Sequence, residues 1–313
     1  MADIVISEFM DEAAVAELAT RHATLYDPGL VDRPDELARA VRDCRALIVR
    51  NRTQVRGALL AGAERLAAVG RLGVGLDNID VDACKARGVA VFPATGANDV
   101  SVAEYVIATA MVLLRGAYAV TPKVAAGGWP RNALIGGREI SGKTLGLVGF
   151  GAIARETARR ARALGMEVVG HDPYVAADDP AWAAHEARSA PLDALLAESD
   201  VVSLHVPLTA TTRNLIDAGA LSRMKRDAVL INAARGGVVD EAALAAALRA
   251  GALGGAALDV FDEEPLDAAR GAVFVDCANL LLTPHIAGVT AESNVRVSSV
   301  TARNVLKALE AAR

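Results

Sequence analysis

Short apolar runs alternate with helix-like stretches over the first 98 residues of the chain. The runs are residues 4–6, 46–49, 66–69 and 89–91, and the helix-like stretches lie near 11–20, 34–43, 55–62 and 80–86. Regular alternation of strand and helix predicts a parallel sheet with helices on its faces. This part of the sequence has no glycine-rich phosphate-binding turn.

The same alternation continues to the end of the chain, beginning with a strongly helical segment at 102–115. Ser101 and Glu104 have the spacing of a capping box at its start. Further strands are predicted at 145–148, 168–170, 200–204, 228–232, 256–259 and 280–282, and further helices at 117–126, 153–164, 240–250 and 290–311. Residues 176–189 are predicted to be a surface excursion.

Residues 145–172 combine an apolar run, the turn Gly149-x-Gly151-x-x-Ala154, a helical stretch and a second apolar run that ends at Asp172. This is the pattern of a βαβ unit that binds a dinucleotide, with the pyrophosphate at the helix N-terminus. Asp172 lies 21 residues after Gly151, where a carboxylate accepts hydrogen bonds from a ribose. It would repel a 2′-phosphate, so the sequence favours NAD over NADP.

We therefore predict an α/β protein with two domains. Residues 99–286 would form a Rossmann-type doubly wound parallel sheet that binds NAD. Residues 1–98 together with 287–313 would form a smaller, flavodoxin-like substrate-binding domain. The two crossings, near 98–101 and 286–290, are expected to act as hinges.

Composition and charge limit the kinds of binding partner that we expect for this protein. The chain has 313 residues, 53% of them hydrophobic and 23% charged, with a net charge of −5, which gives no general attraction for nucleic acid. Cys44, Cys84 and Cys277 are scattered and suggest neither disulfides nor a metal site. The N-terminus has no basic region of a signal peptide, and the apolar stretch 105–114 is too short to span a bilayer. A cytoplasmic protein with no membrane, nucleic-acid or metal partner is expected.

Three polar residues follow three of the predicted strands: Arg235, Glu264 and His285. The carboxyl ends of parallel strands border the ligand crevice of a doubly wound sheet. Together with the dinucleotide turn, these residues form a candidate catalytic set. The four other histidines are interpreted as structural.

At this point the sequence resembles the NAD-dependent D-2-hydroxyacid dehydrogenases. The matching motifs are RLGVGLDNID at 71–80, SVAEY at 101–105, GLVGFGAIA at 146–154, LHVPLT at 204–209, INAARGGVVDEAAL at 231–244, AALDVFDEEPL at 256–266 and TPHIAG at 283–288. The resemblance covers nearly the whole chain. It implies a reversible hydride transfer between NAD and a small D-configured 2-hydroxy acid.

The resemblance also implies a role for each candidate. His285 would be the acid–base, Glu264 its carboxylate partner, and Arg235 the group that grips the substrate carboxylate. Further cofactor contacts are expected at Gly149, Gly151, Ala152, Ile153, Asp172, Val206, Pro207, Ala233, Ala234, Asp259 and Gly288. Asp259 is expected to bind the nicotinamide carboxamide.

Substrate contacts are expected from the backbone of Gly73-Val74-Gly75 and from Arg50 and Asn51, with Arg131 and Arg138 as weaker candidates. An Arg50 that faces the substrate implies a second anion, such as a phosphate, sulfonate or carboxylate. The chain is faintly similar to sulfolactate dehydrogenases in particular. It ends soon after its last helix, so serine feedback through a C-terminal regulatory domain is not expected.

Two other functions are consistent with these motifs. One is a non-catalytic NAD sensor, which can keep all three polar residues. The other is a relative that acts on a different substrate, such as a phosphite dehydrogenase. Resemblance to the family also suggests a homodimer, with the apolar helix 102–114 contributing to the interface.

Overall fold

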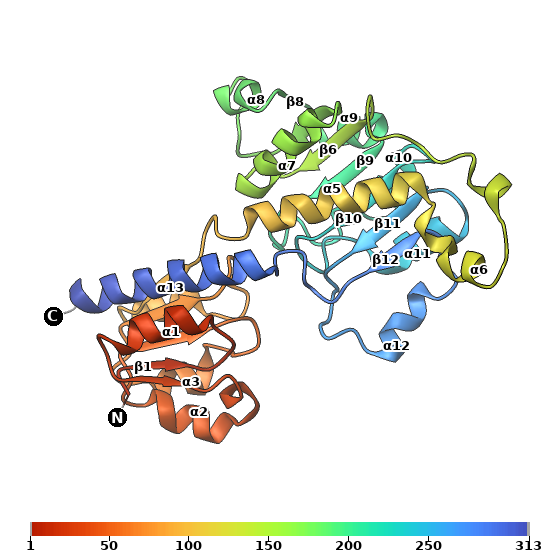
Figure 1. Cartoon of the computed structure of the whole chain (residues 1–313). Helices are drawn as coiled ribbons and strands as arrows, with labels where there is room; N and C mark the ends of the chain where they lie inside the picture. Colours follow the sequence, from red (N-terminus) through yellow and green to blue (C-terminus); the bar gives the residue numbers. More distant parts are fainter. Residues whose placement is uncertain (1, 312–313) are drawn as a thin grey trace. The chain divides into compact units, whose positions relative to one another are not determined.

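The computed structural model describes residues 2–311 and divides the chain into two compact units. Residues 1–98 and 289–313 form unit 1, and Asp99–Gly288 form unit 2. The sequence placed the second boundary at 286/287, whereas the units divide at 288/289. Each unit has its own parallel sheet and its own core (Figure 1).

Unit 1 is a five-stranded sheet in the order β2-β1-β3-β4-β5, and every strand pair is parallel. Its strands are β1 (Ile4–Ile6), β2 (Thr24–Tyr26), β3 (Ala46–Val49), β4 (Ala68–Arg71) and β5 (Ala90–Pro93). Its helices are α1 (Glu12–Ala19), α2 (Pro34–Val41), α3 (Gly57–Gly62), α4 (Val81–Ala86) and α13 (Ala291–Ala311). This strand order is that of the flavodoxin-like fold.

Strand side chains alternate between the two faces of this sheet. Ile4 and Ile6 pack with α1 and α13, whereas Val5 packs on the other face with α2, α3 and α4. Both faces are apolar, so the strands appear in the sequence as continuous apolar runs rather than as alternating ones.

Unit 2 is a seven-stranded sheet in the order β12-β11-β10-β9-β6-β7-β8, again all parallel. Its strands are β6 (Thr144–Val148), β7 (Glu167–His171), β8 (Ala187–Ser189), β9 (Val201–Leu204), β10 (Val229–Asn232), β11 (Gly255–Leu258) and β12 (Leu280–Leu282). Its helices are α5 (Asp99–Arg115), α6 (Thr121–Ala125), α7 (Ala152–Ala163), α8 (Pro180–Ala184), α9 (Leu192–Glu198), α10 (Ala218–Arg223), α11 (Glu241–Arg249) and α12 (Ala268–Gly271). The strand order reverses between β6 and β9, which is the switch point of a Rossmann-type sheet.

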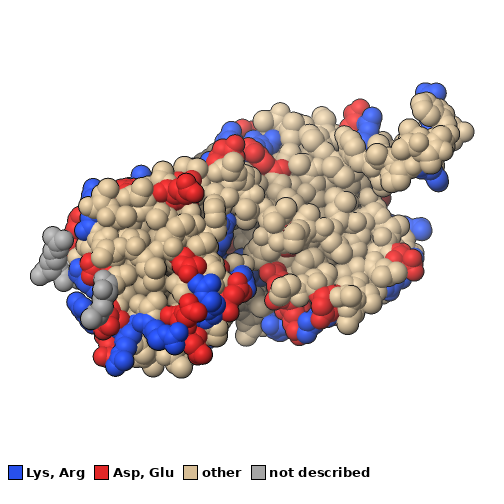
Figure 2. All heavy atoms as spheres, turned by 60° about the horizontal axis from the view of Figure 1, so that its bottom comes forward, with Lys and Arg blue, Asp and Glu red and all other residues tan. Residues whose placement is uncertain are grey.

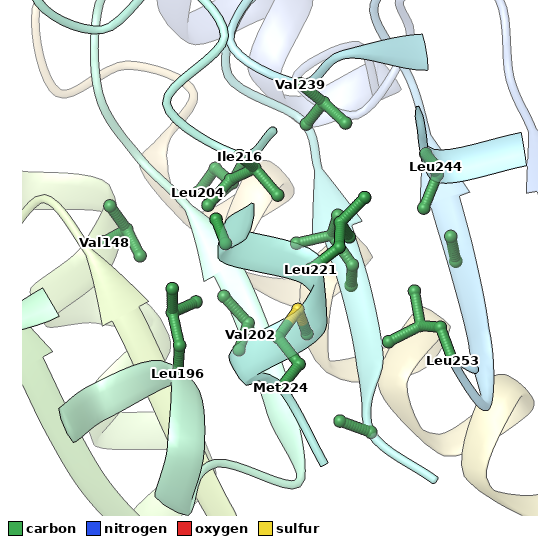
Figure 3. Close-up of a cluster of buried hydrophobic side chains, with 14 of the residues drawn as sticks. Val148, Leu196, Val202, Leu204, Ile216, Leu221, Met224, Val239, Leu244 and Leu253 are labelled. Carbon is green, nitrogen blue, oxygen red and sulfur yellow. The ribbon is translucent and has the colours of Figure 1, made fainter. Parts of the chain in front are cut away.

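Two apolar layers sandwich the sheet of unit 2. One face carries α5 and α7 over Leu145, Leu147 and Ile231. The other carries α9, α10 and α11, and its close-packed side chains include Leu204, Ile216 and Leu221 (Figure 3). In the described part of the chain no single helix is long and apolar enough to cross a bilayer. Only α5 and the segment Tyr118–Ala125 pass such a test together, as a pair bent by 68°.

Three local predictions were wrong. The edge strands β2 and β8 were not predicted, because the sequences TLY and ARS are half exposed and lack an apolar run. The second of them lies in the stretch expected to be a surface excursion. The capping box at Ser101 does not form, because α5 begins at Asp99 and Ser101 lies inside the helix.

The charged side chains do not segregate by sign. Figure 2 shows basic and acidic residues side by side along the visible face, with apolar and uncharged surface between them. Many are paired, for example Arg33 with Asp27 and Arg52 with Asp32.

Candidate active site

The glycine turn follows β6 at the switch point of the unit 2 sheet. Gly149 has φ of +92°, a conformation that costs a residue with a Cβ about 1 kcal/mol or more. A Cβ at this position would also lie 2.7 Å from the carbonyl oxygen of His205, which follows β9. Only glycine therefore lets the turn close against the neighbouring strand end.

The backbone of this turn is tied to the end of β7. Gly149 donates its N–H to the carbonyl of His171 at 2.8 Å, and Phe150 donates its N–H to Asp172 Oδ2 at 2.9 Å. The Phe150 ring is fully buried and stacks on Trp182 with 4.0 Å between ring centroids. Phe150, the middle residue of the turn, thus packs in the core of unit 2, and this packing anchors the turn.

The first turn of α7 faces outward from this loop. Gly151 is its N-cap and supplies no side-chain hydrogen bond, and a Cβ at Gly151 would meet nothing within 4 Å. Ala152 is exposed and Ile153 is half-buried. The backbone N–H groups of this turn are positioned to bind a pyrophosphate, so the residues fit the dinucleotide that the sequence predicted.

The Asp172 carboxylate is half-buried beside the turn. Its Oδ1 accepts a hydrogen bond from the Tyr174 backbone N–H at 2.9 Å. Each carboxylate oxygen can accept two hydrogen bonds, so Asp172 can hold the turn and still accept from a ribose. Sequence reasoning gave it only the second task.

The remaining predicted cofactor residues lie just after strands at the carboxyl edge of the same sheet. Val206 and Pro207 follow β9, Ala233 and Ala234 follow β10, and Gly288 ends unit 2. Val206 is half-buried against Gly149. The side-chain Oδ1 of Asn232 accepts the N–H of Ala234, and its Nδ2 donates to the carbonyl of Arg235, so a buried amide shapes the loop after β10.

His205, also after β9, has a neutral ring. Burial lowers its pKa to about 4, because a charged imidazolium would lose its hydration. Its Nε2 lies 3.0 Å from the Ser203 hydroxyl. This matches the structural interpretation given to it from the sequence.

His285 and Glu264 lie in hydrogen-bond contact although 21 residues separate them. Nδ1 of His285 is 2.6 Å from Oε2 of Glu264. Burial raises the pKa of the Glu264 carboxyl, but the hydrogen bond from His285, the His285 and Arg235 charges and the Phe261 N–H together hold it below its ordinary value. An ionised carboxylate only accepts, so Nδ1–H donates and Nε2 is left for chemistry.

The backbone of His285 is in the left-handed region, with φ of +55°. Strain of this kind costs of order 1 kcal/mol and persists only where surrounding contacts hold it. Those contacts come from Asp259: its carbonyl accepts the His285 N–H at 2.8 Å, and its carboxylate accepts the N–H groups of Ile286 and Ala287, each at 2.8 Å.

Asp259 is 1% exposed, and its Oδ1 also accepts the Thr283 hydroxyl at 2.6 Å. Tyr105 of α5 in turn lies 2.7 Å from that hydroxyl. The carboxylate is therefore committed to the loop that carries His285. The nicotinamide contact expected of Asp259 stays a prediction.

Arg235 is half-buried in the loop after β10. Its Nη1 donates to the Ala234 carbonyl at 2.6 Å, and its charge contributes to the lowered pKa of Glu264. The three candidate catalytic residues thus lie at the carboxyl edge of one sheet, each on a loop after a different strand.

Apart from Arg235 and the two weaker arginine candidates, the predicted substrate residues belong to unit 1 and lie at the carboxyl edge of its sheet. Arg50 follows β3 and is half-buried, and its Nη2 donates to Asn294 Oδ1 at 2.8 Å. Burial lowers its pKa more than the nearby Glu8 charge raises it. Asn51 is exposed, and its backbone N–H donates to Glu8.

Gly73, Val74 and Gly75 follow β4. Gly73 has φ of +148° and donates its N–H to the Arg71 carbonyl at 2.8 Å, which gives this loop a sharp bend. Val74 and Gly75 are partly exposed beyond it.

The two weaker arginine candidates lie elsewhere. Arg138 donates to Asp227 Oδ2 at 2.7 Å, and Asp227 precedes β10, at the amino edge of the sheet. That pairing directs Arg138 away from the edge where His285 lies. Arg131 is exposed on a short 3₁₀ segment, Arg131–Leu134.

Sequence reasoning missed Glu8, Asn78 and Thr283, each of which shapes a predicted loop. For Glu8 a signal was present: it lies two residues after the end of the apolar strand Ile4–Ile6. The rule that flagged the strand ends of unit 2 applies equally there. Thr283 directly follows β12 and carries the same strand-end signal, whereas Asn78 lies seven residues after β4 and carries none.

Comparison with known proteins agrees with this arrangement. Residues 107–287 match the family model described as D-isomer specific 2-hydroxyacid dehydrogenase, NAD binding domain. The chain is 59% identical to an (S)-sulfolactate dehydrogenase of Chromohalobacter salexigens over 99% of both chains. It is 42% identical to a D-3-phosphoglycerate dehydrogenase of Mycobacterium tuberculosis over 98% of its own length, but spans only 56% of that relative.

A solved structure extends the comparison to the fold. A D-lactate dehydrogenase from Aquifex aeolicus, complexed with NAD and lactic acid, superposes with a TM-score of 0.85 at 29% identity, covering 98% of this chain and 95% of that one. The strand orders of both sheets, the dinucleotide turn and the family match agree with one another. The chain therefore belongs to the D-isomer specific 2-hydroxyacid dehydrogenases, and it is an NAD-dependent oxidoreductase.

Proposed function

We propose that the protein oxidises a three-carbon D-configured 2-hydroxy acid that carries a second anionic or polar group on C3. The preferred substrate is (S)-3-sulfolactate, whose second group is an anion, and D-3-phosphoglycerate or D-glycerate are alternatives. The observation that carries the second anion is Arg50. Its guanidinium is half-buried and, among residues 2–311, no carboxylate pairs with it. A partly desolvated cation that forms no direct ion pair favours an anionic ligand.

The identity to the sulfolactate dehydrogenase supports the choice of substrate, and the stereochemistry is consistent with it. Replacing the methyl group of D-lactate by CH₂SO₃⁻ makes that carbon outrank the carboxyl carbon in the naming rules. The same spatial arrangement then changes its label from R to S. An (S)-sulfolactate is therefore a D-configured 2-hydroxy acid, as the family requires.

In this proposal each candidate residue has one task. His285 accepts the C2 hydroxyl proton at Nε2, and Glu264 stabilises the imidazolium that forms. Arg235 binds the C1 carboxylate through its planar fork of N–H donors. The backbone of Gly73-Val74-Gly75 is a second donor set for that carboxylate. NAD, when bound, accepts the hydride that leaves C2.

In this proposal the two units bind different parts of the ligands. Unit 2 holds the cofactor, since the family model matches within it, and we assign the substrate's second anion to unit 1 through Arg50. The glycine turn follows β6 and the loop carrying His285 follows β12. Along the sheet edge, the ends of β9, β10 and β11 lie between these two loops. A dinucleotide laid across those strand ends would place its nicotinamide end on the side of His285.

We also propose a cytoplasmic homodimer. The dimer is supported by a segment of unit 2, residues 116–141, which we call the arm. The arm includes α6 and extends away from the sheet of unit 2 (Figure 1). Four large apolar side chains of the arm are exposed: Tyr118, Val124, Trp129 and Ile135. Exposed apolar groups of this density mark an interaction surface, and a second copy of the chain is the partner that the family suggests.

The experiment follows NADH formation with (S)-3-sulfolactate, D-3-phosphoglycerate, D-glycerate and D-lactate. Arg50→Ala should lower kcat/KM for the substrate with a second anion by about 100-fold, as loss of a charge-assisted contact does, and leave D-lactate unchanged. The matched control is Arg52→Ala, which removes the same charge from the same loop, where the side chain is exposed and pairs with Asp32. An equal effect of both variants would mean general electrostatic attraction, and the Arg50 assignment would be abandoned.

A separate variant tests the chemistry. His285→Ala should lower kcat by roughly 10³-fold with the Kd for NAD unchanged, because only the proton transfer is removed. Absence of turnover by the wild-type protein with every acid in the panel would favour an NAD-sensing role instead.

A further inference from the structure

The loop of residues 50–53 lies at the switch point of the unit 1 sheet. The strand order β2-β1-β3-β4-β5 reverses between β1 and β3, and this loop follows β3. In doubly wound sheets, ligands bind beyond the carboxyl ends of the strands at the switch point. The position of the loop is therefore that of a ligand-binding element, independently of any resemblance.

A buried carboxylate accepts the backbone N–H groups of this loop. Glu8 lies two residues after the end of β1 and is 5% exposed. Its Oε1 accepts the N–H groups of Arg50 at 2.9 Å and Thr53 at 3.0 Å. Its Oε2 accepts those of Arg52 at 3.1 Å and Asn51 at 3.3 Å. Four consecutive backbone donors thus converge on one side chain.

A buried amide holds the carbonyl side of the same loop. Asn78, also 5% exposed, donates from Nδ2 to the carbonyls of Thr53 at 2.7 Å and Arg50 at 3.3 Å. The hydroxyls of Ser7 and Thr53 lie 2.9 Å apart and add a third tie. Buried polar groups cost free energy unless every partner is in place, so the loop is confined to one conformation.

The side chain that this clamp presents is Arg50. Its guanidinium carbon lies 5.8 Å from the centroid of the Phe9 ring, the residue next to Glu8, and Nη2 is held by Asn294. Glu8 therefore fixes the backbone of Arg50, and the residue after Glu8 supplies the ring beside the Arg50 guanidinium. The neighbouring Arg52 is directed to Asp32 instead.

We propose that Glu8 and Asn78 are positioning residues for substrate selectivity: they clamp residues 50–53 so that the Arg50 guanidinium is pre-oriented for the second anion of the substrate. This inference rests on the proposed function of Arg50 and adds the residues through which that function is set. Pre-orientation lowers the ordering cost that binding would otherwise incur.

The clamp makes a prediction that a purely structural role does not. Glu8→Gln keeps the size of the side chain but replaces one acceptor oxygen by an NH₂ group, which cannot accept the two N–H groups that face it. Asn78→Asp likewise replaces the donor to Arg50 and Thr53 by an acceptor. Both variants should loosen Arg50 without touching the reacting carbon.

The readout is the ratio of kcat/KM for (S)-3-sulfolactate to kcat/KM for D-lactate, measured with full-length protein. Glu8→Gln and Asn78→Asp should each lower this ratio by about tenfold or more, through KM rather than kcat. Arg52→Ala should leave it unchanged. The double variant Glu8→Gln/Arg50→Ala should lower it no further than Arg50→Ala alone, because residues acting through one contact are not additive.

The outcomes separate the two proposals. If Arg50→Ala leaves the ratio unchanged, the assignment of Arg50 fails and the clamp hypothesis fails with it. If Arg50→Ala lowers the ratio but folded Glu8→Gln and Asn78→Asp do not, only the clamp hypothesis is overturned. Thermal unfolding and the Kd for NAD, which binds to unit 2, establish that each variant is folded. Should Glu8→Gln fail to fold, Asn78→Asp alone decides.

Discussion

The carboxylate of Asp172 accepts a hydrogen bond from the backbone N–H of Phe150, 2.9 Å away and 22 residues earlier in the chain. The acid that ends β7 therefore helps to shape the phosphate-binding turn that ends β6. The same carboxylate is the ribose acceptor that the sequence predicts, so one side chain would serve two requirements of dinucleotide binding. A substitution at this position should consequently disturb both.

Asp172→Asn tests this double role. The amide can present only one acceptor oxygen, so either Phe150 or Tyr174 loses its partner. We expect the Kd for NAD to rise about tenfold and the preference for NAD over NADP to fall, because the charge that repels a 2′-phosphate is removed. Titration of both cofactors measures the two effects. Asp178→Asn, an exposed acid on the following loop, is the control and should change neither value.

The central strands of both sheets could be predicted because both faces of each sheet are covered, which makes the strands continuous apolar runs. The edge strands β2 and β8 could not, because their residues face solvent and carry no such signal. Arg235, Glu264 and His285 were found as polar residues at strand ends. That they share a sheet edge follows from the parallel sheet that the sequence predicts, whereas the order of the strands along that edge is contained in no single-sequence pattern.

The roles of buried polar residues were the least predictable part. Asp259 was expected to face the cofactor, yet the sequence cannot show that three donors from residues 283–287 converge on its carboxylate. These contacts also account for the left-handed backbone of His285. Long-range side-chain-to-backbone hydrogen bonds leave no periodic trace in a sequence, and they fix the geometry of both predicted sites.

Glu264→Gln should lower kcat/KM by roughly 10- to 100-fold, the usual effect of losing a residue that orients a catalytic group. Because the Glu264 pKa is held below its ordinary value, the wild-type carboxylate stays ionised at every pH above the ordinary titration range of a carboxyl group. Its contribution to stability is likewise present above the ordinary carboxyl pKa and is lost only as pH falls through the lowered one. The neutral amide no longer stabilises the imidazolium that forms in the reaction, so the loss should fall mainly on kcat, with the Kd for NAD unchanged. An unchanged kcat would contradict the pairing.

Substitutions in the arm should weaken dimerisation without changing the fold of the protomer. Trp129 and Ile135 are each 81% exposed, so replacing both by alanine removes no contact from the core of unit 2. We expect the double variant to shift the wild-type dimer toward monomer at micromolar concentration, measured by sedimentation equilibrium, with an unchanged circular dichroism spectrum. Val275→Ala, an exposed apolar residue outside the arm, should leave the dimer intact. A wild-type protein that sediments as a monomer would contradict the homodimer proposal.

His205 should make the stability of unit 2 depend on pH. Its pKa in the folded chain is about 4, against about 6.5 in an unfolded one, so the unfolded state binds the proton more readily between these values. The free energy of unfolding therefore decreases as pH falls, by about 2 kcal/mol between pH 7 and pH 5 from this group. His205→Gln removes the titrating ring and should flatten this part of the dependence. Urea unfolding at pH 7, 6 and 5 measures it, with His22→Gln in unit 1 as the matched histidine control. An equally steep dependence in His205→Gln and wild type would show that the ring is hydrated enough to remain protonatable in the folded state.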